Sequence, residues 1–159
     1  MNISERITRM RALALAWASH SGPLALLLVR LSLAAVFVLS GWGKVHDLAK
    51  VTGYFTELGI PAPHANAVFV SFIELGCGTL LLVGLASRLA ALPLIPNMAV
   101  AIITAKRDDI HGIADLFAVD EFMYVVLCLV IVAFGPGLFS IDALLVRLFG
   151  SSSQDAARA

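Results

Sequence analysis

Charged residues are scarce in this sequence, and neither sign is in excess. Only 14% of the 159 residues are charged, and 11 basic residues balance 11 acidic ones. Without a basic field the chain does not attract a phosphate backbone, so nucleic acid is excluded as a partner. Apolar residues instead make up 60% of the chain, compared with roughly 45–50% in soluble domains. We therefore expect an integral membrane protein whose main partner is the lipid bilayer.

Cysteine is also rare. Cys77 and Cys128 lie far apart and form neither a Cys-x-x-Cys pair nor a zinc-type Cys/His spacing, so we expect no disulfide framework and no metal site. A haem held between spans takes its axial ligands from inside the membrane. All four histidines fall outside the long apolar segments, at positions 20, 46, 64 and 111. We therefore expect no haem.

Long apolar segments dominate the rest of the chain. A hydrocarbon core about 30 Å thick requires roughly 20 mostly apolar residues in a helix. Four segments approach this length, at residues 23–43, 66–86, 88–105 and 119–134. Lipid offers no water to satisfy an open sheet edge, which favours helices, and short connections favour antiparallel neighbours. The sequence predicts an all-α, integral-membrane four-helix bundle.

The chain divides into three parts. Residues 1–22 are predicted to form an N-terminal segment at the cytoplasmic interface, residues 23–149 the four-helix transmembrane domain, and residues 150–159 a polar, disordered tail. Two short amphipathic helices are predicted to lie at the membrane interfaces. One carries Leu48, Val51, Phe55 and Leu58. The other follows Gly135-Pro136-Gly137, carries Ile141, Leu144, Leu145 and Leu148, and is capped by Ser140 or Asp142.

The distribution of basic residues predicts the orientation. Cytoplasmic ends of membrane spans carry an excess of lysine and arginine. With both termini in the cytoplasm, that side holds the arginines at positions 6, 9, 11, 88, 147 and 158, whereas the opposite side holds Lys44, Lys50, Lys106 and Arg107. We therefore expect a multi-pass protein with its N- and C-termini on the cytoplasmic side.

Three polar residues interrupt the apolar segments: Arg30, Glu74 and Asn97. A rise of 1.5 Å per helical residue puts them at depths of roughly 10, 18 and 13 Å from the cytoplasmic edge, in one slab of the bilayer. An isolated charge there costs at least ~2.5–3.5 kcal/mol on insertion scales. We therefore expect Arg30 and Glu74 to turn inward and pair with each other, with Asn97 adding hydrogen bonds.

Two interpretations of such a pair stay open. In the first, the pair is structural and fixes the register of two helices. In the second, it lines a pocket for a polar head group such as a quinone carbonyl, or it relays a proton, because ionisable residues inside spans are functional candidates. One face of the first helix also carries Phe37, Gly41 and Lys44. A groove along this face would reach Lys44 and Trp42 at the opposite interface, although Trp42 alone is typical of an interfacial anchor.

The sequence resembles the DoxX-like membrane proteins. The resemblance covers most of residues 30–145 and depends on the order of four elements: Ser40-Gly41-x-Gly43-Lys44, Phe55 through Gly59-Ile60-Pro61, Glu74-Leu75-Gly76-x-Gly78, and Gly135-Pro136-Gly137 followed by Ser140-Ile141-Asp142. It implies a four-helix domain in the inner membrane of a bacterial cell. Members of that family are associated with quinone-linked oxidoreduction and with membrane complexes that handle oxidative or thiol stress.

The resemblance implies a membrane subunit of a quinone-linked oxidoreductase or oxidative-stress complex. In this hypothesis the quinone head group binds near the Arg30–Glu74 pair, and the candidate cofactor-binding residues are Arg30, Glu74, Asn97, Trp42 and Lys44. No catalytic residue is assigned. A protein partner would carry the redox centre, because the chain has no metal or flavin motif of its own, and a homo-oligomer is compatible with this arrangement. The alternative is a non-catalytic membrane scaffold or assembly factor. A solute carrier is disfavoured, since the sequence has no internal repeat.

Overall fold

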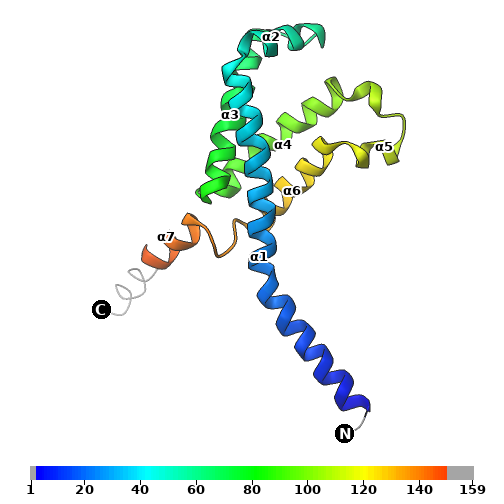
Figure 1. Ribbon diagram of the computed structural model, residues 1–159, viewed down its shortest axis with the longest axis vertical. Coiled ribbons are helices and arrows are strands. Elements are labelled where there is room, and N and C mark those ends of the chain that lie inside the picture. Colours follow the sequence, from blue (N-terminus) through cyan, green and yellow to red (C-terminus); the bar gives the residue numbers. More distant parts are fainter. Residues whose placement is uncertain (1–2, 150–159) are drawn as a thin grey trace.

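The described chain is built from helices only (Figure 1). The structure, a computed structural model, describes residues 3–149, with side chains for residues 5–11 and 21–148. Its elements are α1 (Ile3–His46), α2 (Leu48–Glu57), α3 (Pro63–Val83), α4 (Ser87–Thr104), the 3-10 helix η1 (Arg107–Asp109), α5 (Ile113–Ala118), α6 (Asp120–Phe134) and α7 (Ile141–Phe149). Residues 3–149 contain no strand, which confirms the predicted all-α fold. The predicted disordered tail, residues 150–159, lies outside the described residues.

Three helices are long and apolar enough to cross a bilayer. They are residues 21–46 of α1, which number 26, and the 21 and 18 residues of α3 and α4. The protein is therefore a helical membrane protein. The fourth predicted span is α6, which has only 15 residues, or about 22 Å of helix, compared with the ~30 Å of a hydrocarbon core. That α6 crosses the membrane stays a prediction.

The N-terminal helix differs from the prediction. The sequence predicts a span that begins at Pro23 after a separate segment, but α1 is one helix of 44 residues with Pro23 inside it. A proline removes only one donor from the backbone ladder, and here the hydrogen bonds on either side keep the helix continuous. The span consequently continues into an extension that projects from the bundle, drawn in dark blue in Figure 1.

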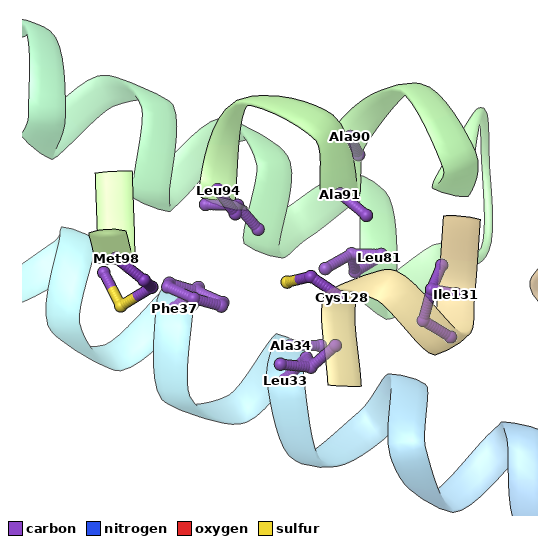
Figure 2. Close-up of a cluster of buried hydrophobic side chains, with 10 residues drawn as sticks. All are labelled: Leu33, Ala34, Phe37, Leu81, Ala90, Ala91, Leu94, Met98, Cys128 and Ile131. Atoms are coloured by element: carbon purple, nitrogen blue, oxygen red, sulfur yellow. The ribbon is translucent and has the colours of Figure 1, made fainter. Parts of the chain in front are cut away.

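The apolar core joins four helices (Figure 2). The side chains of Leu33, Ala34 and Phe37 come from α1, and Leu81 comes from α3. The other members of the cluster come from α4 and α6: Ala90, Ala91, Leu94, Met98, Cys128 and Ile131. The short helix α6 therefore packs into the same core as the three long helices. Cys128 is a buried member of this core, and both cysteines are free thiols.

Two glycines bring the backbones of α1 and α3 into contact. A Cβ atom added at Gly78 would lie 2.8 Å from the backbone nitrogen of Val38, and one added at Gly41 would collide with the backbone of Leu75. Small residues at a contact allow helices in a membrane to approach closely. Because the two contacts follow one another along antiparallel helices, they also fix which residues of α1 lie opposite which residues of α3.

Both short amphipathic helices that the sequence predicts are present, whereas their position at the membrane interfaces stays a prediction. α2 begins after Asp47, whose side chain accepts a hydrogen bond from the Lys50 backbone N–H at 3.1 Å. α7 is capped by Ser140, whose Oγ accepts from the Ala143 backbone N–H at 3.1 Å. These helices lie at opposite ends of the bundle, α2 at the end where α1 turns into α3 and α7 at the end where α3 turns into α4 (Figure 1).

The close approach of α1 and α3 predicts an asymmetry between two neighbouring glycines. Gly78→Ala should lower the free energy of unfolding in detergent by about 1–3 kcal/mol, because the new methyl group overpacks a backbone contact. The matched control is Gly76→Ala, since a Cβ at Gly76 has no atom within 4 Å. That control should be neutral or slightly stabilising through helix propensity. Equal losses from both variants, measured by denaturant unfolding, would contradict the packing described.

Candidate functional site

The most buried carboxylate of the described chain lies in the middle of α3. Glu74 is 1% exposed and accepts hydrogen bonds from side chains of two other helices. On α1, Ser40 Oγ lies 2.8 Å from Glu74 Oε2, and Lys44 Nζ lies 2.5 Å from both carboxylate oxygens. On α4, Asn97 Nδ2 donates to Oε1 at 3.0 Å. A charge that is costly inside a membrane is thus surrounded by donors, one of them of opposite charge.

The predicted pairing of Arg30 with Glu74 is wrong. Arg30 is 3% exposed and donates instead to backbone carbonyls, from Nη1 to Pro136 O at 3.1 Å and from Nη2 to Phe139 O at 2.7 Å. The partner of Glu74 is Lys44.

The register of α1 against α3 explains this difference. Arg30 and Lys44 are 14 residues apart (44 − 30), about 21 Å along the helix. The contact between Gly41 and Leu75 places Glu74 beside the Lys44 end of α1, whereas Arg30 lies against Gly84 at the other end of α3. The sequence prediction places both charges at a similar depth because it counts from predicted span ends. Helix ends predicted from sequence are uncertain by about two to four residues, and this error is large enough to hide the separation of Arg30 from Glu74.

Arg30 and Asp142 instead form a second polar cluster where α3, α4 and α7 meet. Asp142 accepts hydrogen bonds from the backbone N–H groups of Ala86 at 2.8 Å and Ser87 at 3.1 Å. Ala86 has a left-handed φ of 47°, and these bonds help to hold that conformation at the start of α4. Gly84 is also left-handed, with φ 73°, and a Cβ there would lie 2.5 Å from Arg30 Nη1. Asp142 therefore satisfies backbone N–H groups at the start of α4, and Arg30 satisfies carbonyl groups of the loop between α6 and α7.

A cavity of about 870 Å³ lies beside Glu74. Ser40, Lys44, Glu74 and Asn97 form one polar wall of this cavity, and α2, α3 and α4 contribute mostly apolar side chains to the other walls. The charged residues Lys50, Lys106 and Glu121 also belong to its lining. Of the five residues predicted to bind a cofactor, the structure brings Glu74, Lys44 and Asn97 together at this cavity. Arg30 is not among its lining residues.

Trp42 also lies outside the cavity lining. It is 58% exposed, its ring lies against His46 with a centroid separation of 4.3 Å, and its backbone oxygen contacts His46 Nδ1 at 2.9 Å. Because Trp42 faces away from the bundle near the end of α1, its surroundings are those of an interfacial anchor.

Three residues of the site are not among those predicted from the sequence. Ser40 lies one helical turn before Lys44 on α1, a spacing that places both on one face, so this residue could have been found from the motif. Glu121 and Tyr124 line the cavity from α6. Glu121 Oε2 is buried and has no hydrogen-bond partner among the described residues. No local pattern indicates that these two face the cavity, because their position depends on the packing of α6.

The arrangement can bind a hydrogen-bond acceptor. Lysine has three N–H donors and a side-chain amide has two, so after the bonds to Glu74 both Lys44 and Asn97 keep donor capacity for a ligand oxygen. The side chain of Lys44 is 28% exposed, which connects the buried carboxylate to the surface of the protein.

The fold and the site together define a small helical membrane protein with an ion pair buried beside an apolar cavity. A family model described as DoxX matches residues 25–107, more than half of the chain, and the protein belongs to this family. The match includes α2, α3, α4 and all four residues of the polar wall. An uncharacterized membrane protein of Mycobacterium tuberculosis, Rv3486, is 32% identical over 133 residues, which cover 76% of this chain and 81% of the relative. No solved structure gives a significant match.

The revised pairing predicts a selective energetic coupling. In a double-mutant cycle, Lys44→Met and Glu74→Gln should be coupled by about 1–2 kcal/mol in the free energy of unfolding, because they remove two ends of one contact. Arg30→Met and Glu74→Gln should instead be additive within ~0.5 kcal/mol, as expected of distant sites. Denaturant unfolding in one detergent measures all variants. A larger coupling to Arg30 than to Lys44 would refute the assignment.

Proposed function

We propose that this DoxX family protein is the quinone-binding membrane subunit of an oxidoreductase or oxidative-stress complex. The observation that carries the proposal is the position of the Lys44–Glu74 ion pair and Asn97 in the wall of a mostly apolar cavity. Ligand sites typically have volumes of about 300–1,000 Å³, with mostly apolar walls and a few placed polar groups. The cavity of about 870 Å³ falls within this range.

The residues present fit the chemistry of a quinone. A quinone offers carbonyl acceptors on a flat ring and an apolar tail, and here donors lie on one wall with apolar side chains opposite. Lys44 and Asn97 would donate to the carbonyl oxygen, and Glu74 would lie next to the same oxygen. Phe37 and Tyr124 pack edge to face with a centroid separation of 5.9 Å and both line the cavity. Together they offer an aromatic surface for the ring.

The exposure of the outer lining residues supports a lipid-soluble ligand. Tyr54, Phe69 and Val100 line the cavity and are 48%, 61% and 47% exposed. They belong to α2, α3 and α4, so the cavity reaches the outer surface of the helices, which is apolar there. A ligand dissolved in the bilayer would enter from this side without crossing water.

Glu74 would serve as the proton-holding group of the site. Reduction of a quinone to a quinol would require two electrons and two protons, so Glu74 would have to be reprotonated between the two transfers. The Glu74 carboxylate can hold one proton at Oε1 or Oε2, and Ser40 and Lys44 keep it oriented. Lys44, being partly exposed, would pass the proton between Glu74 and water. Electrons would come from a protein partner with its own redox centre, since the chain has no metal or flavin motif.

We place the protein in the inner membrane of a bacterial cell with both termini in the cytoplasm. Helix α7 and the start of α1 lie toward the same end of the bundle (Figure 1). The basic residues Arg6, Arg9, Arg88 and Arg147 belong to that end, as the positive-inside rule favours. The polar wall with Lys44 then lies toward the periplasmic side.

A binding measurement tests the proposal. The chain in mild detergent should bind a benzoquinone with one isoprenoid unit, and Glu74→Gln should weaken the affinity roughly 10- to 100-fold, because the lost interactions involve a charged group. The matched control is Glu57→Gln on α2, which lies outside the cavity lining and should change the affinity less than about twofold. Isothermal titration calorimetry gives the dissociation constants.

A second variant separates binding from folding. Asn97→Leu leaves the Lys44–Glu74 ion pair in place but removes a donor, and it should weaken binding roughly fivefold to tenfold. Failure of the wild-type chain to bind any quinone, while Glu74→Gln is merely less stable, would refute the proposal. That result would favour the alternative, a non-catalytic scaffold or assembly factor. One observation favours this alternative: Ser40, Lys44 and Asn97 already donate hydrogen bonds to Glu74, so the carboxylate needs no ligand to be stable.

A further inference from the structure

A second cavity lies at the opposite end of the bundle from the Glu74 site. This groove of about 770 Å³ is bounded by the middle of α1, the start of α4, the loop after α6 and the helix α7. Two basic residues line it, Arg88 from α4 and Arg147 from α7. Most of its other lining residues are apolar or glycine.

The lining of the groove keeps a net positive charge, because two arginines stand against one aspartate. Neither Arg88 nor Arg147 forms an ion pair with any acidic side chain in the described part of the chain. The one acidic residue of the lining is Asp142, and its two oxygens are taken by the backbone N–H groups of Ala86 and Ser87. Arg88 makes one long bond, from Nη2 to Ala133 O at 3.4 Å. Its donors, like those of Arg147, stay available to an anion.

The backbone after α6 gives Arg88 room to lie in the groove. A Cβ atom added at Gly135 would come within 3.2 Å of Arg88 Nε and 3.3 Å of Nη2, so a side chain there would press on the guanidinium. Arg30 also stabilises this loop by donating hydrogen bonds to the carbonyl oxygens of Pro136 and Phe139. The loop that forms one wall of the groove is therefore anchored to α1.

The location of the groove favours a lipid over a free anion. α3 ends, α4 begins and α6 ends around it, so it lies where the hydrocarbon of the bilayer gives way to the headgroups. Leu89, Phe134 and Leu138 line it and are 69%, 70% and 56% exposed. A free anion would use the arginines alone, whereas a phospholipid would place its phosphate between them and its acyl chains on the apolar walls.

We propose that this groove binds an anionic phospholipid, with Arg88 and Arg147 holding the phosphate headgroup. The site is separate from the Glu74 cavity, and the two share no lining residue. The bound lipid would fasten α4 to α7, because each of these helices contributes one of the two arginines. The proposal does not depend on whether the Glu74 cavity takes a quinone.

Lipid titration monitored by native mass spectrometry tests this site. The full chain in mild detergent should bind phosphatidylglycerol more tightly than phosphatidylcholine. Each arginine near an anionic headgroup contributes about fivefold in affinity, so the double variant Arg88→Gln/Arg147→Gln should weaken phosphatidylglycerol binding roughly 25-fold. The matched control removes two other arginines, Arg6→Gln/Arg9→Gln, at the exposed start of α1 outside the groove, and should leave the affinity within about twofold.

A single variant and a competition with inorganic phosphate test the proposal further. Arg147→Gln alone removes no hydrogen bond within the described residues, so it should fold normally and weaken binding about fivefold. Inorganic phosphate at the concentration that saturates the lipid site should displace little phosphatidylglycerol. Unchanged lipid binding in the arginine variants, an equal loss in the Arg6/Arg9 control, or full displacement by phosphate would each overturn the proposal.

Discussion

The burial of one carboxylate constrains the arrangement of the bundle more than any other interaction. An ionised group at hydrocarbon depth has to find partners inside the protein, and Glu74 finds them on both neighbouring helices. Lys44 and Ser40 fix α1 against α3, and Asn97 fixes α4 against α3. The geometry is possible only because Gly41 brings the backbones of α1 and α3 together close to this level. Packing and charge compensation therefore support the same register.

The two ends of the bundle satisfy their charges in different ways. At the α2 end, charged side chains pair with each other beside a cavity, which leaves them able to exchange partners with a ligand. At the α7 end, Asp142 binds backbone N–H groups that the start of α4 leaves without partners, and Arg30 binds carbonyl groups of the loop between α6 and α7. Because these side chains bind backbone groups, they stabilise the conformations of the connections between helices, and their role at this end is structural. Because Arg30 binds the loop after α6, it does not line the Glu74 cavity.

Composition and periodicity predict the all-α fold and most of its helices, although not the continuity of α1 through Pro23. Apolar length predicts the long helices, and helical spacing of Leu48, Val51 and Phe55 predicts α2, because both depend on local sequence. The pairing of Arg30 was not accessible in the same way. The cost of a buried charge predicts that Arg30 needs a partner, but the identity of the partner depends on the register of the packed helices. The partners are the backbone carbonyls of residues 136 and 139, and every residue has such a carbonyl, so the sequence does not single these two out. For the same reason Glu121 entered the site only through tertiary packing.

The shortness of α6 would have a mechanical consequence for the surrounding membrane if this helix crosses it, as the sequence predicts. A helix of 15 residues covers about 22 Å, so a hydrocarbon layer about 30 Å thick would then have to compress by several ångströms along this flank. Such elastic deformation costs fractions of a kcal/mol per Å. Because the longer helices α1 and α3 produce no such deficit, the strain would be confined to one side of the molecule. That side is where contact with another polypeptide would relieve the most deformation of the lipid.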